Sequence, residues 1–189
     1  FFHDPRVIEV LAKHGLTVEV QKAGSREIAT SFDLSGYDFG FPAGIPAAEK
    51  LRRENKIHKS YSPFFTPMAI ASWKRIADIL IANDLATDKG GYYEVDLGKL
   101  MQLVESQNKW KELKSSDDYA VNKAVLISST DIRKSNSAAM YLSLASYVAN
   151  GNSVVKSDTE AEKVVEFLES LFFHQGFVEY SSAAPFQDY

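Results

Sequence analysis

The chain has 189 residues, a formal net charge of −4 and no cysteine, with 45% hydrophobic and 24% charged residues. The length suits one domain or two small lobes, and the composition is ordinary for a globular protein. The acidic balance excludes a general nucleic-acid binder, and the lack of cysteine excludes disulfides, zinc–thiolate sites and thiol catalysis. No apolar run approaches the roughly 20 residues that a membrane-spanning helix needs.

The first part of the chain alternates between helix and strand signals. Asp4-Pro5 predicts a helix start, because Asp can cap and Pro fits the first helical position, and Gly15 predicts the helix end. The elements expected next are a strand over residues 16–20, a helix from about Ser25, a strand over 37–42 and a helix over 45–55. This alternation predicts a parallel α/β sheet.

Residues 56–73 form a long segment that is broken by Pro63 and Pro67. Because it is too long for one ordinary strand, we interpret it as a hinge that crosses between two lobes near these prolines. Thr66 lies at the crossing and is a candidate ligand residue. The expected division is therefore lobe I over residues 1–65, lobe II over 66–180, and the start of a return segment over 181–189.

The second half of the chain carries stronger helix signals. Residues 74–85 predict a helix, and residues 89–110 predict a loop followed by an amphipathic helix with Leu97, Leu100, Met101 and Val104 on one face. The elements expected after it are a buried strand over 124–128, a helix over 138–149 that is apolar on nearly every side, and a helix from Thr159 to a stop at Gly176.

A polar turn between the expected strand 124–128 and the next helix is the main candidate site. It holds six small polar or charged residues: Thr130, Asp131, Arg133, Ser135, Asn136 and Ser137. Free N–H groups at a helix start suit an anion, and an arginine supplies a planar fork of donors for an oxyanion. The alternative is that Ser135 only caps the helix and Arg133 pairs with Asp131.

A second turn repeats this design near the N-terminus. Gly24 permits close approach of the backbone, and Ser25 and Arg26 add a hydroxyl and a charge at a helix start. Plain capping explains this turn equally well. If the two turns lie on opposite sides of the hinge, they would face each other and clamp one ligand.

No cofactor, metal or catalytic set is predicted from the residue pattern. The four histidines, at positions 3, 14, 58 and 174, have no metal-ligand spacing, and no nucleophile elbow, phosphate loop or dinucleotide fingerprint is present. The sequence therefore favours a binding protein over an enzyme, although an enzyme for a phosphorylated or carboxylated substrate stays open as an alternative.

Several segments resemble a family of bacterial extracytoplasmic solute-binding proteins. They are AGSREIA, YDFGFPAGIPAAEK, YSPFFTPMAIASW, VLISSTDIRKSNSAAMYLSLASYVANG and SSAAPFQDY, and TDIRKSNSAAMY is the most specific of them. The resemblance implies an α/β periplasmic-binding-protein type II fold of two hinged lobes, which we expect to be incomplete at both ends. It also implies that an oxyanion would bind at Ser25, Arg26, Thr130, Arg133, Ser135 and Ser137.

The expected function is therefore that of an extracytoplasmic receptor for an ABC-type transporter. It would capture a small polar or anionic ligand in an interlobe cleft, in the periplasm or at the cell surface, with or without a lipid anchor. The expected partners are the ligand and a membrane permease, and the expected state is a monomer that binds no nucleic acid. The alternative is a cell-surface sensory or interaction module of the same fold without transport.

Overall fold

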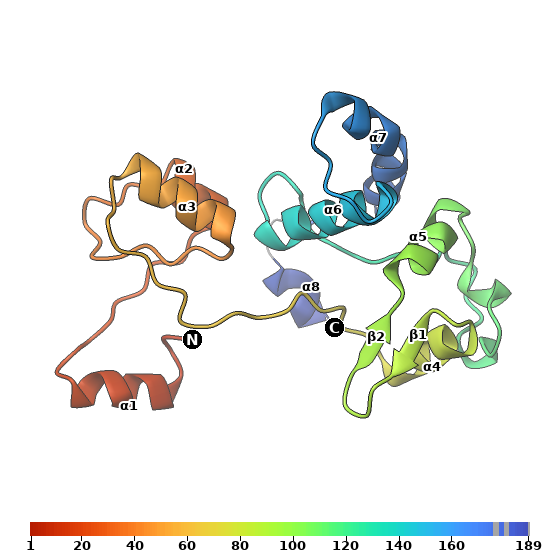
Figure 1. Ribbon diagram of the computed structural model, residues 1–189. Coiled ribbons are helices and arrows are strands. Elements are labelled where there is room, and N and C mark those ends of the chain that lie inside the picture. The colour runs from red at the N-terminus through yellow and green to blue at the C-terminus, as the bar shows by residue number, and fades with distance from the viewer. Residues whose placement is uncertain (176–177, 180–181, 189) are drawn as a thin grey trace. The chain divides into compact units, whose positions relative to one another are not determined.

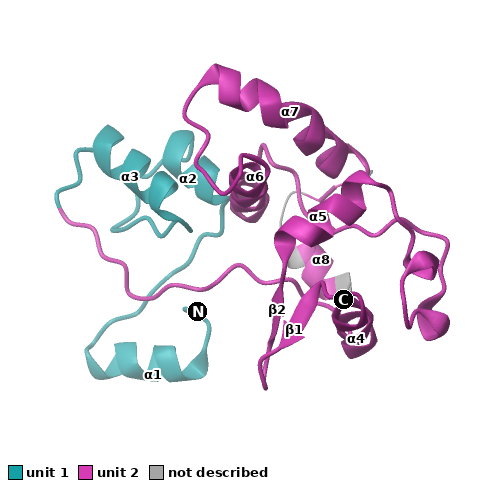
Figure 2. Ribbon diagram, turned by 45° about the vertical axis from the view of Figure 1, so that its right-hand side comes forward, with its two compact units in different colours: residues 1–58 teal, residues 59–189 magenta. Residues whose placement is uncertain are grey.

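The computed structural model describes residues 1–175, 178–179 and 182–188. The chain divides into two compact units, Phe1–His58 and Lys59–Tyr189, which are coloured separately in Figure 2. The boundary between them follows His58, whereas the sequence analysis ended lobe I at residue 65. The first compact unit is unit 1 and the second is unit 2.

Unit 1 contains three helices, α1 (Pro5–Lys13), α2 (Ser25–Thr30) and α3 (Ile45–Glu54). All three were predicted from the sequence, and the α1 boundaries confirm the local signals: the Asp4 carboxylate accepts the Arg6 N–H at 2.9 Å, and Gly15 has a φ of +69°. Helices α2 and α3 lie side by side (Figure 1). Ala29 of α2 and Leu51 of α3 are the buried residues of these helices, so the core of unit 1 is small.

Unit 2 begins with an extended segment, which is followed by helices and one β-hairpin. The elements are α4 (Lys74–Ala82), β1 (Ala86–Asp88), β2 (Tyr93–Val95), α5 (Leu97–Glu105), short 3₁₀ turns at Trp110–Glu112 and Asp117–Tyr119, α6 (Asn136–Ala149), α7 (Asp158–Phe173) and α8 (Ala183–Asp188). Strands β1 and β2 pair in antiparallel register, with Thr87 opposite Glu94. The sequence analysis predicted a loop from residue 89, so it missed β2, and it assigned no element to residues 86–88.

Unit 2 contains two apolar clusters, and α5 contributes buried residues to both of them. The first cluster packs Ile79 and Leu80 of α4 against Leu100 of α5 and Val125. The second cluster lies where α5, α6 and α7 meet, and its buried residues are Met101, Val104, Tyr141, Ala145 and Leu171. Three of the four residues predicted to share the apolar face of α5 are therefore buried, Leu100, Met101 and Val104.

The expected periplasmic-binding-protein type II architecture is wrong. The chain is mostly helical, and the described residues contain only one two-stranded antiparallel sheet instead of parallel sheets in two lobes. The strand signals at 16–20 and 37–42 are strictly local, and neither segment pairs with another strand among the described residues. A strand needs a neighbour to satisfy its backbone groups, so alternation of side chains alone does not form a sheet.

The expected buried strand at 124–128 is also replaced by a looser arrangement. Ala124 forms an isolated antiparallel bridge with Lys109, and the Val125 N–H donates to the Asn108 carbonyl at 2.8 Å. Val125 is 1% exposed, so the predicted burial is confirmed at this residue, whereas the other residues of 124–128 are partly buried or exposed. The partner of this segment is a nearby turn rather than a parallel strand.

Helices α6 and α7 differ in detail from the sequence predictions. Helix α6 is not buried on every side, because Met140 and Leu144 are about half exposed. Helix α7 is capped by Ser157 rather than Thr159, and the predicted stop at Gly176 lies outside the described residues. Within the described part of the chain, no helix is long and apolar enough to cross a membrane.

Candidate functional site

The start of α6 is organised by Ser135, the residue just before the helix. Ser135 has an extended backbone, its hydroxyl oxygen accepts the Ala138 N–H at 3.5 Å, and its own N–H donates to the Asp131 carbonyl at 2.8 Å. It is buried, so it serves the fold as a cap. This part of the site therefore follows the capping alternative that the sequence left open.

Arg133 is paired with Asp131, which was also part of that alternative. The Asp131 carboxylate accepts the Arg133 backbone N–H at 2.8 Å, its Nε at 3.0 Å and its Nη2 at 2.6 Å. These bonds hold the pKa of Asp131 at about 2, with the side-chain bonds to Arg133 as the largest cause. The Arg133 side chain is 80% exposed, so a ligand that used its guanidinium would share it with the carboxylate.

Two residues that follow α7 in the chain form hydrogen bonds with this turn. The Ser129 N–H donates to the Gln175 side-chain oxygen at 2.7 Å, and the Asp131 N–H donates to the Glu179 carbonyl at 2.9 Å. The sequence analysis did not identify Gln175 or Glu179, because no local pattern links them to a segment more than forty residues away.

Thr130 has a different position from its polar neighbours. It is 3% exposed, and its hydroxyl oxygen makes no hydrogen bond among the described residues. A buried hydroxyl without a partner is costly, and such groups in native proteins usually have a water or ligand to bind. Thr130 is thus the residue of this turn whose polarity the fold itself does not use.

The first turn of α6 also leaves donors unused. The backbone N–H groups of Asn136 and Ser137 donate to no acceptor among the described residues, and no acidic residue lies in this turn. The neighbouring helices differ, since α5 is capped by the Asp96 carboxylate and α7 carries Asp158 and Glu160 in its first turn. The positive end of the α6 dipole is therefore less compensated by carboxylates of its own first turn.

The second predicted turn, at the start of α2, is already satisfied from within unit 1. The Gly24 N–H donates to the Glu27 carboxylate at 3.3 Å, and the Ser25 hydroxyl accepts the Ala43 N–H at 2.9 Å. Arg26 is exposed. This turn belongs to unit 1 and the α6 turn to unit 2, so the structure describes each of them separately.

The remaining candidates lie outside any cluster. Thr66 is exposed in the extended segment that precedes α4. All four histidines are exposed, and the described residues hold no group of three or more metal-ligating side chains.

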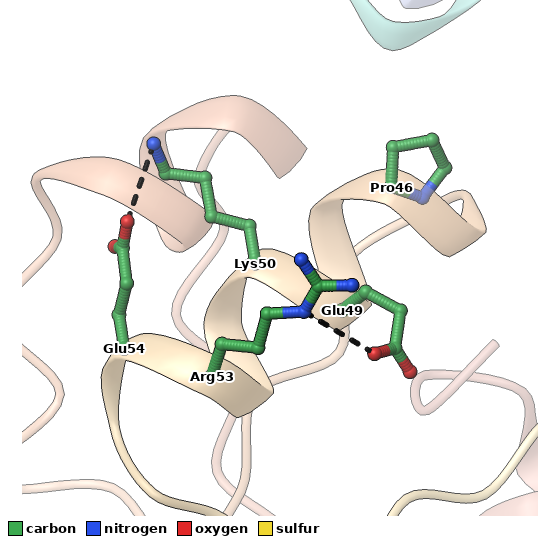
Figure 3. Close-up of a pocket in the computed structure, with 5 residues that line it drawn as sticks. All are labelled: Pro46, Glu49, Lys50, Arg53 and Glu54. Carbon is green, nitrogen blue, oxygen red and sulfur yellow. Dashed lines mark ion pairs between the residues drawn. The ribbon is translucent and has the colours of Figure 1, made fainter.

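A hollow of about 400 Å³ lies on α3 and is lined by charged side chains (Figure 3). Its charges are already paired, since Lys50 contacts Glu54 at 3.3 Å and Arg53 contacts Glu49 at 4.0 Å. These exposed pairs at helical spacing are typical of a solvated helix face and leave no net charge to attract a ligand.

The α6 turn is thus the best candidate site, and it has unused donors on α6 and a buried hydroxyl at Thr130. No protein-family model, curated protein or solved structure matches this chain.

Proposed function

We propose that the chain is a receptor module that binds a small anionic ligand at the start of α6 and performs no chemistry on it. The observation that carries the proposal is the pair of unused backbone N–H groups of Asn136 and Ser137, in a first turn without acidic residues. Backbone donors and the helix dipole together favour an anion at such a position.

Arg133 would act in this proposal as a shared donor. Its Nε and Nη2 atoms are held by Asp131, while most of its surface is exposed. A ligand carboxylate or oxyanion would therefore meet a guanidinium whose charge is partly balanced. We expect moderate affinity, below that of a site with an uncompensated arginine.

The wider role would be the capture of a solute outside the cytoplasm for a membrane permease. The resemblance of the TDIRKSNSAAMY segment to solute-binding proteins supports this role, because that segment contains the α6 turn. The role does not depend on a two-lobed fold, since the donors belong to one helix of unit 2.

The test is isothermal titration calorimetry of the full chain with phosphate, sulfate, molybdate and small carboxylates. Asn136→Pro deletes one of the two N–H donors. Its backbone is compatible with the change, because proline fits the first position of a helix and Ser135 before it is already extended. The matched control, Asn136→Ala, also removes the side chain but keeps the N–H.

We expect one anion to bind the wild type and Asn136→Ala alike, and to bind Asn136→Pro roughly tenfold more weakly, as for a lost hydrogen bond to a charged group. The proposal would be rejected if no anion bound the wild type, or if Asn136→Pro bound with unchanged affinity.

A second candidate function is an interaction module of the cell surface. It is favoured by the extended segment before α4, where Tyr61 is 80% exposed and Phe65 is 93% exposed. Large aromatic side chains in such positions are typical of surfaces that bind another protein. A partner retained by the immobilised chain should be lost on Phe65→Ser and kept on Asn136→Pro, whereas anion binding should show the opposite pattern.

A further inference from the structure

We propose that unit 1 carries a second binding site, for a small organic ammonium cation, in the hollow beside α3. The hollow has a volume of about 530 Å³, within the range of small-molecule sites. It is lined by three aromatic rings, Phe32, Tyr37 and Phe39, and by the carboxylates of Asp33 and Asp38. This site is independent of the α6 turn, because it lies in unit 1 and has the opposite charge.

The aromatic residues of the lining pack on one another or on Phe2, and two of them are well exposed. Phe32 and Tyr37 pack with ring centroids 5.4 Å apart and planes inclined at 59°, and Phe39 packs on Phe2 at 5.9 Å. These contacts hold the rings in place, yet Tyr37 is 44% exposed and Phe39 is 54% exposed. Ring faces that are fixed but accessible attract a cation through the negative potential above the π system.

The described residues that line the hollow include two carboxylates and no cationic side chain. Asp33 and Asp38 are the charged residues in its lining, and neither forms an ion pair in the described part of the chain. The Asp33 carboxylate accepts the Ser35 N–H at 2.9 Å, and this bond lowers its pKa, so it stays ionised at neutral pH. The hollow on α3 provides the contrast, because every carboxylate there contacts a lysine or arginine.

Two of the residues that line the hollow, Gly40 and Leu51, are closely packed. Leu51 is 5% exposed, and the backbone at Gly40 approaches it so closely that an added Cβ would lie 2.7 Å from Leu51 Cδ2. Because these residues are already packed, the hollow is preformed, and a ligand could bind without rearrangement of the core of unit 1. Rings, carboxylates and a preformed hollow together fit a quaternary or tertiary ammonium group.

A cation–π interaction of the kind proposed here also occurs within unit 2. The Arg75 guanidinium carbon lies 4.6 Å from the centroid of the Trp73 ring and 5.1 Å from that of Tyr119. In unit 1 the rings and the negative charge are present without a lining cation, so the site is suited to one supplied from solution.

The experiment is an NMR titration of the full chain with choline and with 3,3-dimethylbutan-1-ol, which has the same shape without the charge. We expect choline to shift the resonances of residues 32–40 and 51–57 and to bind at least about tenfold more tightly than the alcohol, because cation–π and carboxylate attraction need the charge. Equal affinities, or the absence of choline shifts at these residues, would overturn the proposal.

Two variants and a matched control locate the site. Asp38→Asn removes one carboxylate that makes no hydrogen bond among the described residues, and Tyr37→Leu removes one ring. We expect each to weaken choline binding about fivefold or more. Glu19→Gln removes an exposed carboxylate of unit 1 outside the hollow and should leave the affinity unchanged. Unchanged binding in both hollow variants, with native spectra, would reject the site.

Discussion

The Asp131 carboxylate accepts three hydrogen bonds from one residue, Arg133, at 2.8, 3.0 and 2.6 Å. Asp131 is 4% exposed, whereas the Arg133 side chain is 80% exposed. The guanidinium therefore covers the buried carboxylate from the solvent side. The pair ties together the turn before α6, whose backbone also bonds to Gln175 and Glu179.

This pairing predicts how the stability of unit 2 changes in acid. Because the bonds to Arg133 lower the pKa of Asp131 in the folded state from its ordinary 3.8 to about 2, the stability that the carboxylate contributes is fully present above about pH 4 and is lost as the pH falls towards 2. Asp131→Asn should lower stability at neutral pH and flatten the pH dependence between these limits. Urea unfolding followed by tryptophan fluorescence measures this, since Trp73 and Trp110 both lie in unit 2. An unchanged acid profile in the variant would contradict the prediction.

Tyr141 predicts a change at the other end of the pH scale. Its hydroxyl is buried without a hydrogen-bond partner among the described residues, and burial raises the pKa to about 12. Since an unfolded tyrosine ionises near pH 10, stability should be full below about pH 10 and fall as the pH rises towards 12. Tyr141→Phe should remove this loss and leave stability at neutral pH equal or up to about 1 kcal/mol higher.

The control for that variant lies on the same helix. Tyr147 is 40% exposed, so Tyr147→Phe should keep the alkaline loss of stability. Equal alkaline profiles for the two variants in urea unfolding would show that Tyr141 is not responsible.

The burial of Leu171 predicts that unit 2 is sensitive to the loss of this side chain. It is 1% exposed in the cluster between α5, α6 and α7, so Leu171→Ala should cost about 2–5 kcal/mol of unfolding free energy. Phe173 lies two residues later and is 78% exposed, so Phe173→Ala should change stability by less than about 0.5 kcal/mol. Similar losses for both variants in urea unfolding would mean that the α7 face is assigned wrongly.

Gly40 and Gly36 form a matched pair in unit 1. A Cβ at Gly40 would lie 2.7 Å from Leu51 Cδ2, whereas a Cβ at Gly36 would meet nothing within 4 Å. Gly40→Ala should therefore cost about 1–3 kcal/mol through overpacking. Gly36→Ala should be neutral or slightly stabilising, because alanine lowers the entropy of the unfolded chain.

Unit 1 contains no tryptophan, so these two variants need far-UV circular dichroism or NMR as the readout. If Gly36→Ala destabilised unit 1 as much as Gly40→Ala, the contact with Leu51 would not explain the effect.

The sequence by itself determined most helices and the caps of α1 and α6, because these depend on residues close in the chain. Asp4 and Gly15 bound α1 as predicted, and Ser135 caps α6. The periodic face of α5 correctly predicted which of its residues enter the core. The polar turn before α6 was recognisable for the same local reason.

The tertiary structure alone decided which segments pair and which polar groups remain unused. The alternating residues 16–20 form no strand, because a sheet needs a partner segment that local alternation cannot supply. Arg133 pairs with Asp131, although its sequence position suited a ligand equally well. The Thr130 hydroxyl is buried without a hydrogen-bond partner among the described residues, and burial is a property of the whole fold.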